Sequence, residues 1–288
     1  MCSVSFLPHS RGFYLGMNRD ESRQRAPALP PERFTRHEHT ALYPGEPTGG
    51  SWVGVNDTGL TLALINWYAM PRQPGSGRVS RGIVVPSLLA AASFAEVRAA
   101  FAALPKRDMA PFRLLAFAPR DRMVGEFRWD QHTLEEMPHA WEPRHWFSSG
   151  YDEPRAQHER SQVARRAWQK PRAGSLPWLR RLHGSHEPAA GPFSFCMHRK
   201  EAATVSYTEV VVTARAVTMR YHDGPLCHAP QPTATHQLQI ARKDAAPAPT
   251  NEQTKRRHES HRSSLQPSRR PLLPRGLSPR GEIRAIAR

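Results

Sequence analysis

The 288-residue sequence contains only three cysteines, Cys2, Cys196 and Cys227, and their spacing does not suggest a disulfide framework. This scarcity favours a reducing compartment, and we expect a cytoplasmic protein. The N-terminus has neither the basic segment nor the continuous apolar run of a secretory signal, so none is expected. No stretch approaches the roughly 18 consecutive apolar residues of a membrane-spanning helix, so no transmembrane segment is expected.

The C-terminal part of the sequence lacks aromatic residues. From residue 230 to residue 288 there is no Phe, Tyr or Trp, but there are 8 prolines, and 12 Lys and Arg residues stand against 4 Asp and Glu residues. Such a segment buries too little apolar surface to offset the entropy of ordering the chain. We therefore predict a folded domain over residues 1–229 and a disordered, basic, Pro/Arg-rich tail over residues 230–288. The tail's charge permits non-specific phosphate binding, but without aromatic side chains to stack on bases we expect no specific nucleic-acid partner.

Recognisable metal-binding spacings are missing as well. Neither Cys-x-x-Cys nor His-Glu-x-x-His occurs, although Cys196 lies two residues before His198 and Cys227 directly precedes His228. A soft-metal or haem contact at these pairs is the alternative to a structural role. The spacing supports neither a metal site nor a haem site, so we expect no metal ion and no cofactor. Cys196 lies in an apolar stretch and is predicted to be a core residue.

Groups of strands and groups of helices are predicted to alternate along the folded part. Its apolar patterns and turn residues predict strands at residues 2–7, 13–19, 49–56, 60–67, 112–117, 122–129, 146–149, 193–198, 204–213 and 217–221. The predicted helices cover residues 80–104, 152–170 and 175–183, and a capping-box pattern at Ser93 and Glu96 divides the first of them near Ala92. The Pro-rich, polar residues 25–47 are predicted to be loop. This order indicates an α+β fold in which sheets pack together and helices lie outside.

The first two residues, Met1-Cys2, suggest a catalytic nucleophile. If Met1 is removed, which the small second residue permits, Cys2 carries an α-amine with a pKa of roughly 7.7–8.0 beside a thiol with a pKa of about 8.5. The amine can then act as the base for the thiol near neutral pH, without a histidine. On position alone, Cys2 is equally well an incidental small residue, because a nucleophile also needs a group that orients its base.

The first hairpin decides which side chains lie near Cys2. Residues 2–7 and 13–19 are predicted to pair across the three-residue turn Ser10-Arg11-Gly12, in which the glycine suits a positive φ. In that register Cys2 lies opposite Asp20 on the same face, with Cβ atoms about 5 Å apart. A shift of one residue would bring Arg19 opposite Cys2 instead.

Three polar side chains complete the predicted site. Asp20 is expected to hold the α-amine of Cys2, and Asn18 is expected to donate to a developing oxyanion. Asn66 ends an apolar strand, where an amide must find hydrogen-bond partners. It is therefore either an oxyanion donor or an amide that satisfies the backbone at the strand end. Residues 18–21 equally fit a polar strand end that enters a loop.

Seven short motifs connect these residues to a known family. They are Met1-Cys2-Ser3-Val4, Asn18-Arg19-Asp20-Glu21, Gly49-Gly50-Ser51-Trp52-Val53-Gly54, Asn66, Ser80-Arg81-Gly82, Pro111-Phe112 and Tyr207-Thr208-Glu209-Val210. Over about residues 1–228 the sequence resembles the NRDE proteins, also called the transport and Golgi organisation protein 2 family. The resemblance implies a four-layer αββα sandwich of the N-terminal nucleophile hydrolase type, similar to cysteine amidohydrolases such as penicillin V acylases and bile salt hydrolases.

The resemblance also implies a reaction. Cys2 would be nucleophile and base, Asp20 the carboxylate that orients the amine, and Asn66 the oxyanion donor, so the expected activity is hydrolysis of a linear carbon–nitrogen amide bond in a small molecule. The alternative is a non-catalytic carrier on the same fold for haem or an acyl lipid. Replacing Cys2 separates the two, because a carrier keeps its ligand while an enzyme loses turnover.

Three positions depart from the pattern of the amidohydrolases. Met17 and Val205 stand where those enzymes have arginines, and Ser149 stands where they have an asparagine. Arg19 is the cation near Met17 in the sequence, and Arg199 is close in sequence to Val205.

Overall fold

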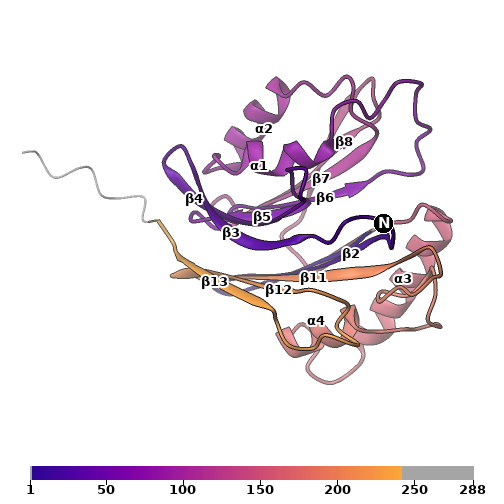
Figure 1. Ribbon diagram of the computed structural model, residues 1–288. Coiled ribbons are helices and arrows are strands. Elements are labelled where there is room, and N and C mark those ends of the chain that lie inside the picture. Colours follow the sequence, from indigo (N-terminus) through magenta and orange to yellow (C-terminus); the bar gives the residue numbers. More distant parts are fainter. Residues whose placement is uncertain (1, 242–288) are drawn as a thin grey trace, which may run out of the picture. The chain divides into compact units, whose positions relative to one another are not determined.

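The computed structural model describes residues 2–241 (Figure 1), and in them two antiparallel sheets form the centre of the fold. The first sheet contains, in spatial order, β10 (Arg144–Ser148), β1 (Cys2–His9), β2 (Gly12–Ser22), β11 (Ala202–Val212), β12 (Ala216–His222) and β13 (Ala234–Gln239). The second contains β3 (Leu29–Arg36), β4 (His39–Gly45), β5 (Val53–Asn56), β6 (Thr61–Asn66), β7 (Phe112–Ala118), β8 (Met123–Trp129) and β9 (Leu134–His139).

Helices cover the outer face of each sheet, as Figure 1 shows. The second sheet carries η1 (Arg81–Ile83), α1 (Val84–Leu88) and α2 (Phe94–Ala103), and the first sheet carries α3 (Glu153–Trp168) and α4 (Leu176–His183). A third apolar core, which includes Val4, Phe6, Met17 and Val55, lies between the two sheets. The predicted four-layer αββα sandwich is confirmed.

The predicted register of the first hairpin is wrong by one residue. The turn has two residues rather than three, so Cys2 lies opposite Arg19 and not opposite Asp20. The observed register pairs Val4 with Met17, and both apolar side chains face the core between the sheets. The predicted register would have set Val4 against Asn18, because a one-residue shift turns a strand's side chains to the other face.

Gly12 follows this turn for a steric reason. A Cβ atom added at Gly12 would lie 2.0 Å from the carbonyl oxygen of Val212 in β11. Only a residue without a side chain allows β2 and β11 to pair this closely here.

Residues 25–47, predicted to be loop, contain β3 and β4, so that prediction is wrong. The strand predicted at residues 193–198 is also wrong, since this segment is irregular and makes only a single bridge, between His198 and Ala203. The break between α1 and α2 lies where the capping box predicted it: the Ser93 side chain accepts from the Glu96 backbone N–H, and the Glu96 carboxylate accepts from Ala92.

The folded part extends beyond the predicted boundary at residue 229. Strand β13 pairs with β12, so residues 230–241 of the expected tail are part of the folded unit. The remainder of the predicted disordered tail, residues 242–288, lies outside the described residues.

None of the helices between residues 2 and 241 is long and apolar enough to cross a membrane.

Candidate active site

A small pocket of about 100 Å³ lies where β1, β2 and β6 meet the segment that leads into α1. Its lining includes four of the five predicted site residues, namely Cys2, Arg19, Asp20 and Asn66. The structure therefore brings these four together, although not through the predicted strand register. Within residues 2–241, a metal ion could be held by groups of three or more His, Cys, Asp or Glu side chains. No such group in this range includes a residue that lines this pocket.

Cys2 begins β1, and its side chain is almost completely buried, at 8% exposure. Burial raises the pKa of the thiol, while a hydrogen bond from the Asp20 backbone N–H lowers it; burial has the larger effect. A thiol with a raised pKa keeps its proton near neutral pH. A nearby base is therefore needed if this sulfur is to act as a nucleophile.

The Asp20 carboxylate is fixed from two sides. It accepts a hydrogen bond of 2.6 Å from the Thr204 hydroxyl of β11, and its other oxygen lies 3.5 Å from the guanidinium of Arg160 in α3. Both the Asp20 and the Arg160 side chains are 0% exposed. Arg160 also donates to the Ser3 hydroxyl at 3.0 Å and to the Cys2 carbonyl at 3.4 Å. The carboxylate and the start of β1 are thus held by one buried cation.

Sequence reasoning missed Arg160. The sequence signal that could have revealed it is its spacing from Ala156, Val163 and Ala167, which places it on the buried face of α3. An arginine on an apolar stripe needs a partner, since burying an unpaired charge is costly. Burial lowers the pKa of Arg160 and the Asp20 carboxylate counteracts this, which fits a paired, desolvated cation.

Arg19 supplies a second cation to the pocket. Its guanidinium lies 4.3 Å from the centre of the Trp52 ring and donates to a Glu46 carboxylate oxygen at 2.8 Å. Arg25 donates to the other Glu46 oxygen at 2.7 Å, so two arginines share this carboxylate. The corrected register explains the position of Arg19, because the residue opposite Cys2 shares its face of the sheet.

Asn66 ends β6, as predicted, and its amide nitrogen donates to the Tyr68 hydroxyl at 2.7 Å. Arg81 also lines the pocket and donates to the Pro111 carbonyl at 2.9 Å. Burial lowers the pKa of Arg81, and the nearby Tyr68 and Cys2 raise it. Both residues line the Cys2 pocket and carry N–H donors.

The glycine stretch before β5 packs against the turn that carries Arg81. Gly50 has a φ of +98° and packs against Gly82, so that an added Cβ would lie 2.9 Å from the Gly82 backbone. The next residue, Ser51, donates its backbone N–H to the Gly82 carbonyl at 2.8 Å. A residue with a side chain at position 50 would push the Arg81 turn away from Cys2.

Asn18 is not among the pocket-lining residues. Its amide nitrogen donates to the carbonyls of His183 at 2.9 Å and Phe195 at 2.7 Å, and its amide oxygen lies 3.1 Å from the His183 ring. Both N–H groups of the amide are therefore used to join β2 to α4 and to the irregular segment that follows it. This arrangement gives Asn18 a structural task rather than a contact with the pocket.

The expected result of Asn18→Ala is a loss of unfolding free energy of about 1–3 kcal/mol, because two buried carbonyls lose their donor. Urea denaturation of the full chain measures the loss. Asn66→Ala is the matched control: Asn66 is partly exposed and should change stability by about 0.5 kcal/mol or less. Equal stability of the two variants would contradict the structural task assigned to Asn18.

The three departures from the amidohydrolase pattern lie in different surroundings. Met17 is buried in the core between the sheets, and Ser149 is buried where its hydroxyl accepts from the Tyr151 backbone N–H at 3.3 Å. Val205 lies half-buried at an irregularity in β11, beside Arg19 in a neighbouring groove. None of the three lines the Cys2 pocket.

Comparisons with known proteins agree with this fold. The sequence model of the family described as Transport and Golgi organisation 2 matches residues 1–171. A C2A mutant of conjugated bile acid hydrolase from Clostridium perfringens is similar in structure, with a TM-score of 0.50 and 11% identity over 85% of this chain and 94% of that chain. Penicillin V acylase from Agrobacterium tumefaciens has a TM-score of 0.46 and 9% identity over 83% of this chain and 86% of that chain. No curated protein sequence matches significantly. At 11% identity, the likeness to the bile acid hydrolase shows the fold alone.

Proposed function

The chain belongs to the Transport and Golgi organisation 2 family, and we propose that it hydrolyses a linear carbon–nitrogen amide bond with Cys2 as an N-terminal nucleophile. The observation that carries the proposal is the pocket in which the Cys2 thiol lies with Asp20, Asn66 and Arg19. The likeness of the fold to that of a conjugated bile acid hydrolase adds support.

In the proposed first half-reaction, removal of Met1 frees the α-amine of Cys2. The amine takes the thiol proton, and the sulfur attacks the carbonyl carbon of the amide. The carbonyl oxygen becomes an oxyanion that accepts a hydrogen bond from the Asn66 amide. When the carbon–nitrogen bond breaks, the α-ammonium returns the proton to the leaving amine. A thioester on Cys2 remains.

Water completes the cycle in the second half-reaction. The α-amine accepts a proton from water as the hydroxide oxygen adds to the thioester carbon. The carbon–sulfur bond then breaks, the thiol regains its proton, and the acid is released. Asp20, held by Arg160 and Thr204, would keep the α-amine oriented in both halves.

The Cys2 pocket by itself is too small for a large ligand. Drug-sized ligands occupy sites of roughly 300–1,000 Å³, whereas this pocket measures about 100 Å³. A haem or an acyl lipid, the ligands of the alternative carrier function, would not fit in it. A groove of about 330 Å³ shares Arg19 and Arg25 with the pocket and offers room for the rest of an amide substrate.

The direct test combines intact-mass analysis with an electrophilic probe and a library of small amides. We expect Met1 to be absent from the purified chain and the probe to form one adduct at Cys2, not at Cys196 or Cys227. Amides that compete with the adduct identify the substrate class. Active protein that retains or acetylates Met1 would exclude the mechanism, since the amine would no longer belong to Cys2.

Asn66→Ala is expected to lower kcat by about 10²–10³-fold, because an oxyanion donor contributes most in the transition state. Steady-state kinetics with the best amide from the library measure the effect. Tyr68→Phe is the control, as it removes the hydroxyl to which Asn66 donates but leaves the amide in place. An unchanged kcat in Asn66→Ala would remove Asn66 from the mechanism.

A further inference from the structure

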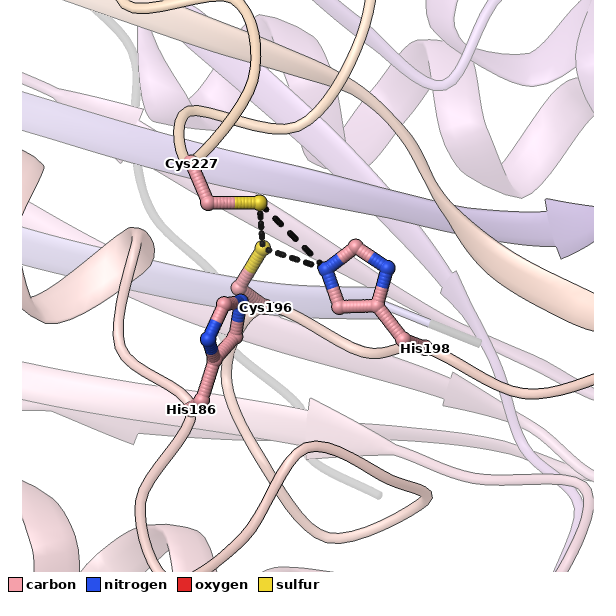
Figure 2. Close-up of side chains that lie close together, drawn as sticks. All are labelled: His186, Cys196, His198 and Cys227. Atoms are coloured by element: carbon pink, nitrogen blue, oxygen red, sulfur yellow. Dashed lines mark hydrogen bonds between the residues drawn. The ribbon is translucent and has the colours of Figure 1, made fainter.

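We propose that His186, Cys196, His198 and Cys227 bind one zinc ion that has a structural role (Figure 2). The four side chains each offer one ligand atom, and these atoms all lie within 4.8 Å of one another. The cluster does not belong to the Cys2 pocket, and the proposal does not depend on the hydrolase function.

The distances fit a tetrahedral site. Zinc–sulfur bonds of about 2.3 Å and zinc–nitrogen bonds of about 2.0–2.1 Å imply tetrahedral edges of roughly 3.3–3.8 Å. The Cys196 and Cys227 sulfurs lie 3.4 Å apart. The Nε2 atom of His198 lies 3.5 Å from the Cys196 sulfur and 3.3 Å from the Cys227 sulfur. Three side chains thus already span one face of the tetrahedron.

His186 provides the fourth position. Figure 2 shows its ring beside Cys196, and its ring centre lies 5.0 Å from that of His198. The side chain is exposed, so a small movement of its loop can complete the site without disturbing a packed core.

The ligand chemistry favours zinc. Two thiolates and two imidazoles are the donors of closed, four-coordinate structural zinc sites, and soft sulfur ligands disfavour magnesium and calcium. Two thiolates also balance the charge of a divalent cation at the partly buried site. A disulfide requires a sulfur–sulfur distance of about 2.05 Å, so the separation of 3.4 Å corresponds to two free thiols.

The ion would join two connections that contain little regular structure. Three ligands lie on the irregular segment between α4 and β11, and Cys227 lies on the segment between β12 and β13. The first segment also contacts Asn18 and Arg160: the Phe195 carbonyl accepts from the Asn18 amide, and the Pro192 carbonyl accepts from the Arg160 guanidinium. Zinc binding would therefore fix the backbone on which the Arg160–Asp20 pair depends.

The test is a metal titration of the full chain after treatment with a chelator. Zinc should bind with a stoichiometry of one ion per chain, measured by elemental analysis. Cobalt(II), used as a spectroscopic probe, should show thiolate charge-transfer bands and the strong visible absorption of tetrahedral coordination. Zinc should also raise Tm, because a ligand that binds only the native state stabilises it.

Variants separate the ligands from their neighbours. Cys227→Ser should abolish the cobalt–thiolate bands or halve their intensity, and His186→Ala, at an exposed position, should weaken zinc binding by at least about 10-fold. His228→Ala is the control, since its ring lies 5.5 Å from His198 but is not one of the four ligands. It should bind zinc as the unaltered chain does.

Several results would overturn the proposal. These are a chain that binds no zinc or cobalt, zinc binding that persists unchanged in Cys227→Ser and His186→Ala, and an oxidised Cys196–Cys227 pair in protein purified without reductant. Because His186 is exposed, His186→Ala keeps the test decisive even if the cysteine variants fold poorly.

Discussion

Cys2→Ala is expected to abolish amide hydrolysis, lowering kcat/KM by about 10⁴-fold or more while leaving the fold intact. Removing the nucleophile of a covalent mechanism leaves only the rate enhancement from binding and the oxyanion donor. The alanine occupies the same buried position at the start of β1 and loses one sulfur atom. Kinetics with the amide identified by the probe competition measure the loss, and urea denaturation measures the stability.

A matched variant tests the α-amine separately from the thiol. If one extra residue precedes Cys2 in the processed chain, the Cys2 nitrogen becomes an amide and is no longer a base, while the thiol is unchanged. General base catalysis contributes about 10²–10⁴-fold, so a loss of that size is expected. Turnover that survives either change would contradict the mechanism. Unchanged binding of haem or an acyl lipid to Cys2→Ala, with no turnover in the unaltered chain, would favour the carrier.

The observed register of the first hairpin could have been predicted from the sequence. Pairing Val4 with Met17 keeps apolar side chains together on one face, and only the two-residue turn allows this. The prediction relied on Gly12 as a turn residue, whereas Gly12 is required by the close approach of β11. The contact between Gly12 and Val212 joins residues about 200 positions apart, so the sequence around Gly12 carries no sign of it.

Three of the four missed strands share a physical cause, and the fourth, β4, lies inside its sheet. Strands β3, β9 and β13 lie at sheet edges, and their sequences are polar or contain proline. Pro30 and Pro31 lie in β3, and Pro138 lies in β9. An edge strand tolerates proline because one side of its backbone needs no partner in the sheet. The central strands other than β4 were predicted from their apolar patterns.

The candidate site was only partly predictable. Cys2, Asp20 and Asn66 were found because the reaction and the family resemblance restrict where they lie in the sequence. Arg160 was marked only by its place on the apolar stripe of α3, without its partner. The sequence showed Cys196, His198 and Cys227 as separate pairs with their neighbours, and only the fold brings them together with His186. Cys196 was predicted to be buried, and it is, but burial alone did not reveal Cys227 at 3.4 Å.

Arg160→Met is expected to lower the free energy of unfolding by about 3–5 kcal/mol, the cost of leaving one partner of a buried ion pair without the other. Asp20 would retain the Thr204 hydroxyl but lose the Arg160 guanidinium, and Ser3 would lose the hydrogen bond from Arg160. Urea denaturation of the full chain measures the change. Adding Asp20→Asn to Arg160→Met should recover part of the loss, because the uncompensated charge is then removed.

Arg165→Met is the matched control on the same helix. Arg165 is exposed near the end of α3, so its replacement should change stability by about 0.5 kcal/mol or less. A similar loss in both variants would mean that methionine weakens α3 itself rather than the ion pair. If Arg160→Met were as stable as the unaltered chain, the pair would not hold Asp20, and the α-amine would need another group to orient it.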